Sequence, residues 1–507
     1  MRRLAAGILL SLAASAPGAE KPLPIRDALR QALAHNLGLG IQRLQAVDSV
    51  DNLELADAAF DLRLRWSNTL GKARTLDEIR AGDFARDAWS SELALEQPLP
   101  WGGTLALSGQ ADRFWEDSNG VAGDRLVQVG TGVSYTQPLL RGGWNAVNLA
   151  PVVTARLGAG RSRLLLRAAV LDLMRSTEVG YWGLAASRSL VSLRETSLRS
   201  AESLLQEVAE RRRLGAATLQ EQLQAEADVA NQRVSVLNAR QQAELADTRL
   251  RRILGLEENG AAELGVDPLP TDAVPGIPDY RAWLGQVLDF DLEAQAQRLQ
   301  VESAETRLGA ARANDLPRLD LTLRGSLAGE AGVHGRLGSA LSALPDERGW
   351  NASASLTLSF PVGFRDSEAQ LRLARRARRA ADLQLAEIRQ ALTFDARAAW
   401  RELESSRARL AAAAAALELQ RRVYEGERAR YSAGVSDIPR VLQAQASLDG
   451  AQLAWVGAVL DTRVAAATSS RLDGTLLARH GFSWDDAEPA VGAGLGPQET
   501  LPPLPPR

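Results

Sequence analysis

The side chains that most often catalyse reactions or bind metals are scarce in this 507-residue chain. It has no Cys, which excludes disulfides, thiolate metal sites, a Cys nucleophile and a lipid-modified Cys. Its three histidines, His35, His334 and His480, stand far apart and have no neighbouring ligands at metal spacing. No Ser/His/Asp set or phosphate-binding Gly loop stands out. We therefore expect no enzyme activity, no metal and no cofactor, with the many Asp and Glu residues on solvated helix faces.

The most informative polar residues belong to a motif that occurs twice. The stretch RRRLGAATLQEQLQAEADVA begins at Arg211, and RARYSAGVSDIPRVLQAQAS begins at Arg428. In both stretches, basic residues are followed by a Gly, then by Ser, Thr or Asp, and then by Leu-Gln-Ala. Gly215 therefore corresponds to Gly434. Gly followed by capping residues indicates a tight turn between two helices. The sequence therefore predicts two helical hairpins of the same kind.

Capping residues mark where the returning helix of each hairpin begins. In the first copy, Thr218 and Glu221 have the spacing of a capping box. In the second copy, Ser436 or Asp437 can cap, and Pro439 fits the first helical turn. Taken alone, these features fit two hairpin tips with no further role as well as they fit a functional site.

Long helices must carry these turns. Stretches that are rich in Ala and Leu and have helical periodicity predict six helices, at about 26–59, 146–213, 218–256, 280–314, 367–431 and 438–477. The fifth has 65 residues and would be about 100 Å long, which no compact domain needs. Ala-rich stripes bury too little apolar area for a helix that long to be stable alone, so we expect coiled-coil packing.

Between the helices, short segments alternate between apolar and polar residues. They predict six strands, at about 62–70, 89–97, 104–115, 127–137, 318–327 and 352–360. Alternation alone fits two soluble sheets as well as a membrane barrel. The strand lengths, near the 9–11 residues that span an outer membrane, favour the barrel, as do six tryptophans in or beside the strands. We expect these tryptophans to form a membrane girdle: Trp66, Trp89, Trp101, Trp115, Trp144 and Trp350.

The N-terminus indicates export. Arg2 and Arg3 precede an apolar run from Leu4 to Ala14 and then small residues, which is typical of a signal peptide. The run is shorter than the roughly 20 residues that a membrane anchor needs. The net charge of −3, with basic and acidic residues interspersed, argues against a nucleic-acid partner.

The order of helix, strands, long helix, turn and helix is written twice. QRLQ occurs at Gln42 and at Gln297, and Pro138 and Pro361 each close a set of strands. We predict a signal peptide at 1–19, a first repeat at 22–256, a linker at 257–279, a second repeat at 280–480 and a disordered Pro-rich tail at 481–507. Six strands have open edges and are too few for the smallest closed barrel of eight, so several chains must share one barrel. The expected fold class is an α+β membrane protein that combines a shared transmembrane β-barrel with a long antiparallel α-helical coiled-coil barrel.

Over about residues 22–480, the chain resembles the TolC family of outer-membrane efflux proteins. The resemblance lies in LPIRDALRQALAHNLGLGIQRLQ, SYTQPLLRGGWNAVNLAP, LTLSFPVGFRDSEAQ and the two turn motifs, and in the order and duplication of these motifs. It implies a homotrimer whose barrel lies in outer-membrane lipid and whose helical tunnel extends into the periplasm. It further implies docking on a periplasmic adaptor and an inner-membrane pump, for passive efflux or type I secretion.

The resemblance also gives roles to the two turns. They would be the adaptor-docking tips, made by Leu214, Gly215, Ala216, Thr218, Ala433, Gly434, Val435, Ser436 and Asp437. The best-known family members carry two inward-facing acidic residues just after the second Gly, and here Arg440 and Gln443 hold those positions. Glu221 and Gln224 are their counterparts in the first copy. We expect these four residues to form the periplasmic gate, with Glu221 and Arg440 pairing between neighbouring hairpins.

One feature departs from the family pattern of two strands per copy. The first copy has an extra hairpin at 89–114, which either joins the barrel, giving eighteen strands in a trimer, or projects outside the membrane; its alternation favours the barrel. The alternative function is a non-conducting exported coiled-coil spacer or fibre of the envelope. Charged residues on the polar side of the strands favour a wet pore instead: Arg63, Arg65, Arg318, Asp320 and Arg324. The sequence does not distinguish drug, metal and protein cargo.

Overall fold

The computed structural model of the protein describes residues 23–77, 82–118, 121–257, 264–270, 276–331, 340 and 349–487. The predicted signal peptide and residues 488–507 of the predicted tail lie outside them. The chain forms two compact units, one of Met1–Arg43, Leu166–Leu292 and Arg389–Gly494, the other of Leu44–Leu165, Glu293–Ile388 and Leu495–Arg507. Within the described residues, no helix is both long enough and apolar enough to cross a bilayer.

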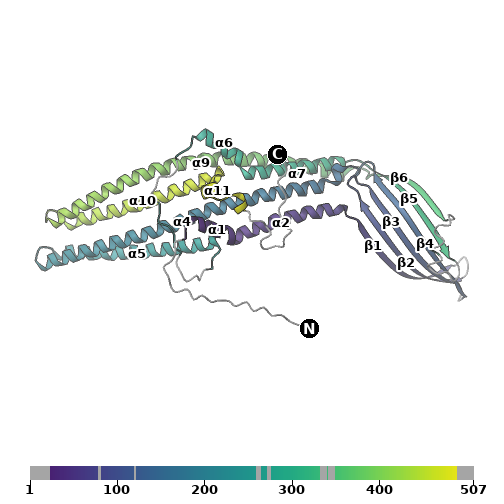
Figure 1. The fold of residues 1–507 in the computed structure, drawn as a ribbon, viewed down its shortest axis with the longest axis horizontal. Coiled ribbons are helices and arrows are strands. Elements are labelled where there is room, and N and C mark those ends of the chain that lie inside the picture. The colour runs from purple at the N-terminus through teal and green to yellow at the C-terminus, as the bar shows by residue number, and fades with distance from the viewer. Residues whose placement is uncertain are drawn as a thin grey trace, which may run out of the picture. The chain divides into compact units, whose positions relative to one another are not determined.

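Helices make up most of the described chain (Figure 1). They are α1 (Ile25–His35), α2 (Leu37–Asp57), the short 3-10 helix η1 (Ala58–Phe60), α3 (Asn145–Asn148), α4 (Ala150–Arg213), α5 (Leu219–Leu254), α6 (Tyr280–Phe290), α7 (Leu292–Ala313), α9 (Arg365–Ser432), α10 (Ile438–Leu472), α11 (Leu476–Arg479) and α12 (Trp484–Ala487). The predicted helices at 218–256 and 367–431 are confirmed as α5 and α9. The other four were predicted as continuous, and this is wrong, because each is divided.

Polar or Gly residues make three of these divisions, whereas Leu149 separates α3 from α4. The backbone of Asn36 is extended between α1 and α2, where its side chain accepts the N–H of Leu39 at 3.0 Å and donates to the carbonyl of Ile253 at 2.9 Å. Asp291 divides α6 from α7. Gly474 has a φ of 75°, in the left-handed region that favours Gly, and separates α10 from α11.

The two-fold repeat is confirmed in the order and length of the elements. The helices α1 and α6 have 11 residues each. The elements α6, α7 and β5 (Arg318–Ala331) each begin 255 residues after α1, α2 and β1 (Arg63–Asp77), respectively. After the strands the spacing is 219 residues, both between the starts of α5 and α10 and between Gly215 and Gly434.

The second unit contains one antiparallel sheet of six strands in sequence order (Figure 1). Besides β1 and β5, the strands are β2 (Gly82–Pro98), β3 (Thr104–Ser118), β4 (Val121–Pro138) and β6 (Trp350–Ser359). All six predicted strands are confirmed in position, but β1 to β5 are longer than predicted, with 14 to 18 residues each. The extra hairpin predicted at 89–114 corresponds to β2 and β3, and it lies inside the sheet between β1 and β4.

The register places the alternating residues of all six strands on two faces. Trp66 pairs with Leu93, Leu107 with Val133, and further ladders continue the row of apolar residues to the last strand. The apolar face includes Leu64, Trp66, Leu93, Leu95, Leu105, Leu107, Val133, Tyr135, Leu321, Leu323, Leu356 and Leu358. The same pairing puts Arg63, Arg65, Arg318, Asp320 and Arg324 together on the opposite face. Much of the apolar face is exposed in the single chain, with Trp66 at 68% and Leu356 at 64%.

Side chains from distant parts of the sequence meet in the core of the first unit. Tyr181 of α4 is fully buried, accepts the N–H of Asp267 at 2.7 Å and lies 2.8 Å from the carbonyl of Leu23. Leu264, Val266 and Leu269 pack on the same cluster. This part of the predicted linker at 257–279 therefore contributes to the core.

The predicted tail starts too early. Residues 481–487 are described, and they include α12. Phe482 is buried, and the guanidinium of Arg26 lies over its ring. The guanidinium of Arg167 lies over the Trp484 ring in the same way. These two aromatic residues hold the first part of the segment that we expected to be disordered.

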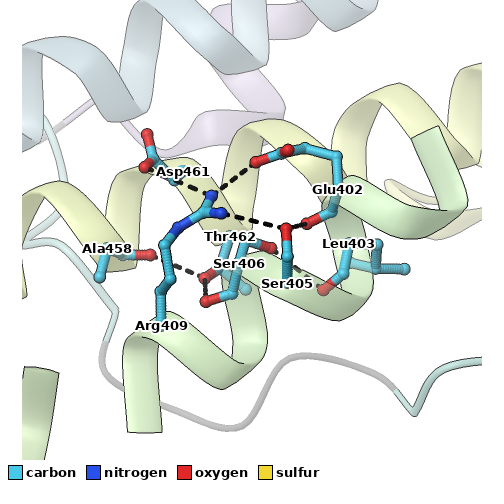
Figure 2. A network of polar contacts seen from close by, with 8 residues as sticks. All are labelled: Glu402, Leu403, Ser405, Ser406, Arg409, Ala458, Asp461 and Thr462. Atoms are coloured by element: carbon cyan, nitrogen blue, oxygen red, sulfur yellow. Dashed lines mark hydrogen bonds and ion pairs between the residues drawn. The ribbon is translucent and has the colours of Figure 1, made fainter. Parts of the chain in front are cut away.

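The helices α9 and α10 pack through small polar residues (Figure 2). The hydroxyl of Thr462 donates to the carbonyl of Ala458 at 2.7 Å and lies 3.3 Å from that of Ser406. At the edge of this contact, Arg409 pairs with Glu402 at 2.6 Å on its own helix and with Asp461 at 3.8 Å on α10. Contacts of the Thr462 and Arg409 side chains therefore join α9 to α10.

Candidate functional site

The two predicted turns have the same hydrogen bonds. In the first, Gly215 has a φ of 77° and donates to the carbonyl of Arg212, while Ala216 donates to that of Arg211. In the second, Gly434 has a φ of 75° and donates to the carbonyl of Tyr431, while Val435 donates to that of Arg430. This pattern ends a helix by satisfying its last carbonyls, and it favours Gly because the left-handed backbone strains other residues.

The starts of the returning helices differ. Thr218 and Glu221 form the predicted capping box, with the Glu221 N–H donating to the Thr218 hydroxyl at 3.2 Å and the Thr218 N–H to the Glu221 carboxylate at 2.6 Å. Asp437 is the N-cap of α10, but its side chain makes no capping hydrogen bond. The prediction of a side-chain cap by Ser436 or Asp437 is therefore wrong. The Ser436 hydroxyl donates instead to Glu427 at 2.9 Å, and Asp437 pairs with Arg440 at 3.3 Å.

Arg211 joins the two hairpins, a role that the sequence reasoning missed. Its guanidinium donates to the carbonyls of Tyr431 and Ser432, both at 3.0 Å, and lies 4.4 Å from the centre of the Tyr431 ring. Glu207 on the same helix holds the guanidinium at 3.1 Å. These carbonyls belong to the last turn of α9, where intrahelical donors are missing and a cation is favourable. The sequence signal was the run of three arginines before Gly215, which does not show which one reaches across.

A small apolar cluster lies behind this contact. It consists of Leu204, Val208, Ala225, Tyr431, Ile438 and Val441, from both hairpins. Burial raises the pKa of the Tyr431 hydroxyl above its ordinary value, although the charge of Arg211 opposes this. The ring of Tyr431 is thus a neutral apolar surface under the guanidinium. The two hairpins are held together by a cation between carbonyl groups and by an apolar contact.

The nine predicted docking residues all lie in the two turns, and all are exposed except the half-buried Ser436. The most exposed apolar side chains among them are Leu214, at 72%, and Val435, at 67%. Of the four predicted gate residues, Glu221 and Gln224 are half-buried, whereas Arg440 and Gln443 are exposed. In the single chain, Glu221 serves the capping box and Arg440 pairs with Asp437.

Farther along the same helices, a buried polar layer connects α4, α5 and α10. Asp449 is 7% exposed, accepts from the Ser197 hydroxyl at 2.7 Å and the Gln232 amide at 3.1 Å, and lies 3.6 Å from Arg194. Asp228 lies near this group. Burial, and then the charge of Asp449, raise the pKa of its carboxyl above the ordinary value.

This layer predicts a pH dependence of stability. Because the pKa of Asp228 is raised in the folded state, its ionised form opposes folding above that pKa, and the opposition fades as the pH falls through it. We expect Asp228→Asn to be more stable than the parent near neutral pH, with the difference shrinking as the pH falls toward the ordinary pKa of an Asp carboxyl. Urea midpoints of both proteins at several pH values measure this. A constant difference at all pH values would contradict it.

The six predicted girdle tryptophans fall into two groups. Trp66, Trp89, Trp115 and Trp350 share the apolar face by register. Trp101 and Trp144 lie outside the strands, where the Trp101 indole donates to the Tyr135 hydroxyl at 3.1 Å and Trp144 is 57% exposed. Paired tryptophan and tyrosine near the ends of strands are typical of a membrane interface.

Comparisons with known proteins agree with this architecture. The family described as outer membrane efflux protein matches residues 28–256 and 283–475, one segment for each copy of the repeat. No curated protein sequence matches the chain significantly.

Solved structures share the fold at low sequence identity. The outer membrane channel CmeC of Campylobacter jejuni is 16% identical with a TM-score of 0.68, over 90% of this chain and 86% of that one. VceC of Vibrio cholerae is 17% identical with a TM-score of 0.66, over 89% and 96%. The open state of Neisseria gonorrhoeae MtrE is 16% identical with a TM-score of 0.61, over 89% and 88%. With the family match over both repeats, the chain belongs to the outer membrane efflux protein family, as its resemblance to TolC proteins predicted.

Proposed function

We propose that this chain is one subunit of a homotrimeric outer-membrane channel that passively exports substrates received from a periplasmic adaptor and an inner-membrane pump. Its family consists of outer-membrane efflux channels and not of enzymes. The observation that carries the proposal is a sheet with one exposed apolar face, one charged face and unpaired outer strands, in a chain that also has two matching helical tips.

The sheet supports the membrane part of the proposal. An exposed apolar face suits lipid, and a face with Arg63, Arg65 and Arg324 suits a water-filled lumen. Open strand edges are not tolerated in lipid, because their backbone groups lack partners there. Several copies closing one barrel remove the edges.

The two tips support the docking part. They present Leu214 and Val435 to solvent beside Gly backbones, which gives each tip one apolar side chain and accessible peptide groups. A duplicated hairpin would supply six such tips from three subunits. We propose that an adaptor binds these tips and that the gate lies just beyond them, at Glu221, Gln224, Arg440 and Gln443.

Within this gate, we propose that Glu221 and Arg440 pair between neighbouring hairpins of the closed assembly. Glu221→Gln is the suitable test, because Gln also closes a capping box and only the charge is lost. We expect Glu221→Gln and Arg440→Gln each to raise the open fraction by about twofold, since an exposed pair contributes about 0–1 kcal/mol. In planar bilayers, the open fraction of the double variant should be close to that of either single variant. Additive effects would show that the two residues act separately.

The function itself is tested on the purified full chain. We expect light scattering to give a trimer, and planar bilayers to show discrete conductance steps. An adaptor encoded beside this gene should be captured by the parent protein and lost with Leu214→Asp and Val435→Asp. A protein without conductance would instead be the envelope spacer or fibre, and a monomer would overturn the proposal.

A further inference from the structure

The β2–β3 hairpin is an insertion in one copy of the duplicated unit. The copies are 255 residues apart at the first strand, Arg63 and Arg318, but 223 apart at the closing prolines, Pro138 and Pro361. The first copy therefore has 32 more residues between these points, close to the 37 of Gly82–Ser118. In the second copy the equivalent strands, β5 and β6, pair directly with each other.

This insertion widens the sheet instead of projecting from it. The strand β2 pairs with β1 from Glu96 to Gly82, and β3 pairs with β4 from Thr104 to Ser118. Each chain thus offers six consecutive strands, with β1 and β6 at the outer edges. Because six is an even number and all neighbours are antiparallel, β6 of one copy runs antiparallel to β1 of another and can pair with it.

The repeat also supplies a template for that junction. Within the chain, β4 ends the first copy and pairs with β5, which starts the second. In an assembly, β6 ends the second copy and would meet the β1 that starts the first copy of the next subunit. If the two junctions are equivalent, the pair Ser134↔Arg324 becomes Thr357↔Thr69, and Val133↔Gly325 becomes Leu356↔Leu70.

The two faces of the sheet provide an independent check of this register. It places Leu356 beside Leu70 on the apolar face, and Thr357 beside Thr69 on the polar face. A slip by one residue would set apolar side chains of one strand beside polar ones of the other, since the side-chain period is two. The offsets of 255 and 223 residues between the two copies do not by themselves require apolar residues of β6 to meet apolar residues of β1.

We propose that the channel is a barrel of eighteen strands, six from each subunit, closed by β6 of one subunit pairing with β1 of the next in this register. The proposal rests on the homotrimer proposed above. At about 4.8 Å between strands and a tilt of about 40°, eighteen strands give a backbone diameter of about 35 Å, against about 24 Å for twelve. Barrels of this strand number enclose an aqueous channel. The hairpin therefore sets the width of the outer-membrane pore.

Engineered disulfides test the junction, and the lack of native Cys makes their result unambiguous. In the template, the Leu139 N–H donates to Leu319 on the apolar face, so residues of the polar face form the closer, non-hydrogen-bonded pairs. Thr69→Cys with Thr357→Cys should thus give a covalent trimer under oxidation that reduction reverses. Thr69→Cys with Ser353→Cys, on the same face but four residues out of register, is the matched control and should remain uncrosslinked.

Electron cryomicroscopy of the parent protein then counts the strands. Eighteen strands with the β2–β3 hairpin in the wall confirm the inference. A trimer with twelve strands and the hairpin outside would overturn the inference and leave the channel function standing. A trimer that crosslinks only in the control pair overturns the register, whereas a protein that is no trimer overturns the proposed function itself.

Discussion

Arg211→Ala is expected to raise the fraction of time that the reconstituted channel conducts by about tenfold or more. In the proposed channel, we expect opening at the tips to separate the α9–α10 hairpin from the α4–α5 hairpin, and Arg211 donates across this contact to Tyr431 and Ser432. A hydrogen bond to a charged group contributes about 1.5–3 kcal/mol, and 1.4 kcal/mol is a tenfold change in an equilibrium. The Arg211 side chain is 24% exposed, so we take the lower part of that range for the two bonds together.

Two further variants separate this tether from a general loss of charge. Arg213 belongs to the same arginine run but is 72% exposed and pairs with Glu210 on its own helix, so Arg213→Ala should conduct like the parent. Arg211→Lys keeps the positive charge but loses the forked guanidinium donor. The fraction of time that it conducts should lie between those of the parent and of Arg211→Ala. Single-channel recordings in planar bilayers measure all three. If Arg211→Ala and Arg213→Ala behave alike, Arg211 does not hold the tips closed.

The fold was predictable because its signals are periodic and repeated. Helices of more than thirty residues, strands of strict alternation and two copies of each element leave few alternative architectures. The breaks were not predictable, because they depend on contacts made after folding. Asn36 interrupts a helical pattern because its side chain reaches the carbonyl of Ile253, 217 residues away.

The candidate site shows the same division. Gly215, Gly434 and the Thr218 capping box follow from local rules and are confirmed. The missing side-chain cap at Asp437 does not follow from local rules. Ser436 instead donates to Glu427 of α9, and Asp437 pairs with Arg440 of α10. Arg211 was missed for the opposite reason: three adjacent arginines are equivalent in sequence, and only helix rotation points one of them at α9.

The register of the sheet lies between these cases. Period-two alternation predicts which residues share a face of one strand, and the ladders confirm that these faces line up over all six strands. It does not predict which strands are neighbours. Alternation favoured a place for the β2–β3 hairpin in the barrel wall, and its pairing with β1 on one side and β4 on the other shows that it lies inside the sheet.

Glu178→Ala is expected to have the largest effect on stability. Glu178 of α4 is 1% exposed, and its two oxygens lie 3.4 Å from Arg479 and 3.1 Å from His480, at the end of the second repeat. Removing one partner of a buried ion pair leaves an uncompensated charge and costs about 3–5 kcal/mol. The contact fixes α11, where Leu476 and Leu477 are also buried. We expect this segment to detach from α4 while the tips remain intact.

Asp172 provides the matched control on the same helix. It pairs with Arg471 at 2.7 Å, but its side chain is 47% exposed, so Asp172→Ala should cost about 0–1 kcal/mol. Hydrogen exchange of the α11 amides reports the local opening free energy without requiring two-state unfolding of the assembly. Arg479→Ala added to Glu178→Ala should recover part of the loss, because it removes the unpaired charge. Equal losses in Glu178→Ala and Asp172→Ala would mean that burial of the Glu178 carboxylate does not set the strength of this anchor.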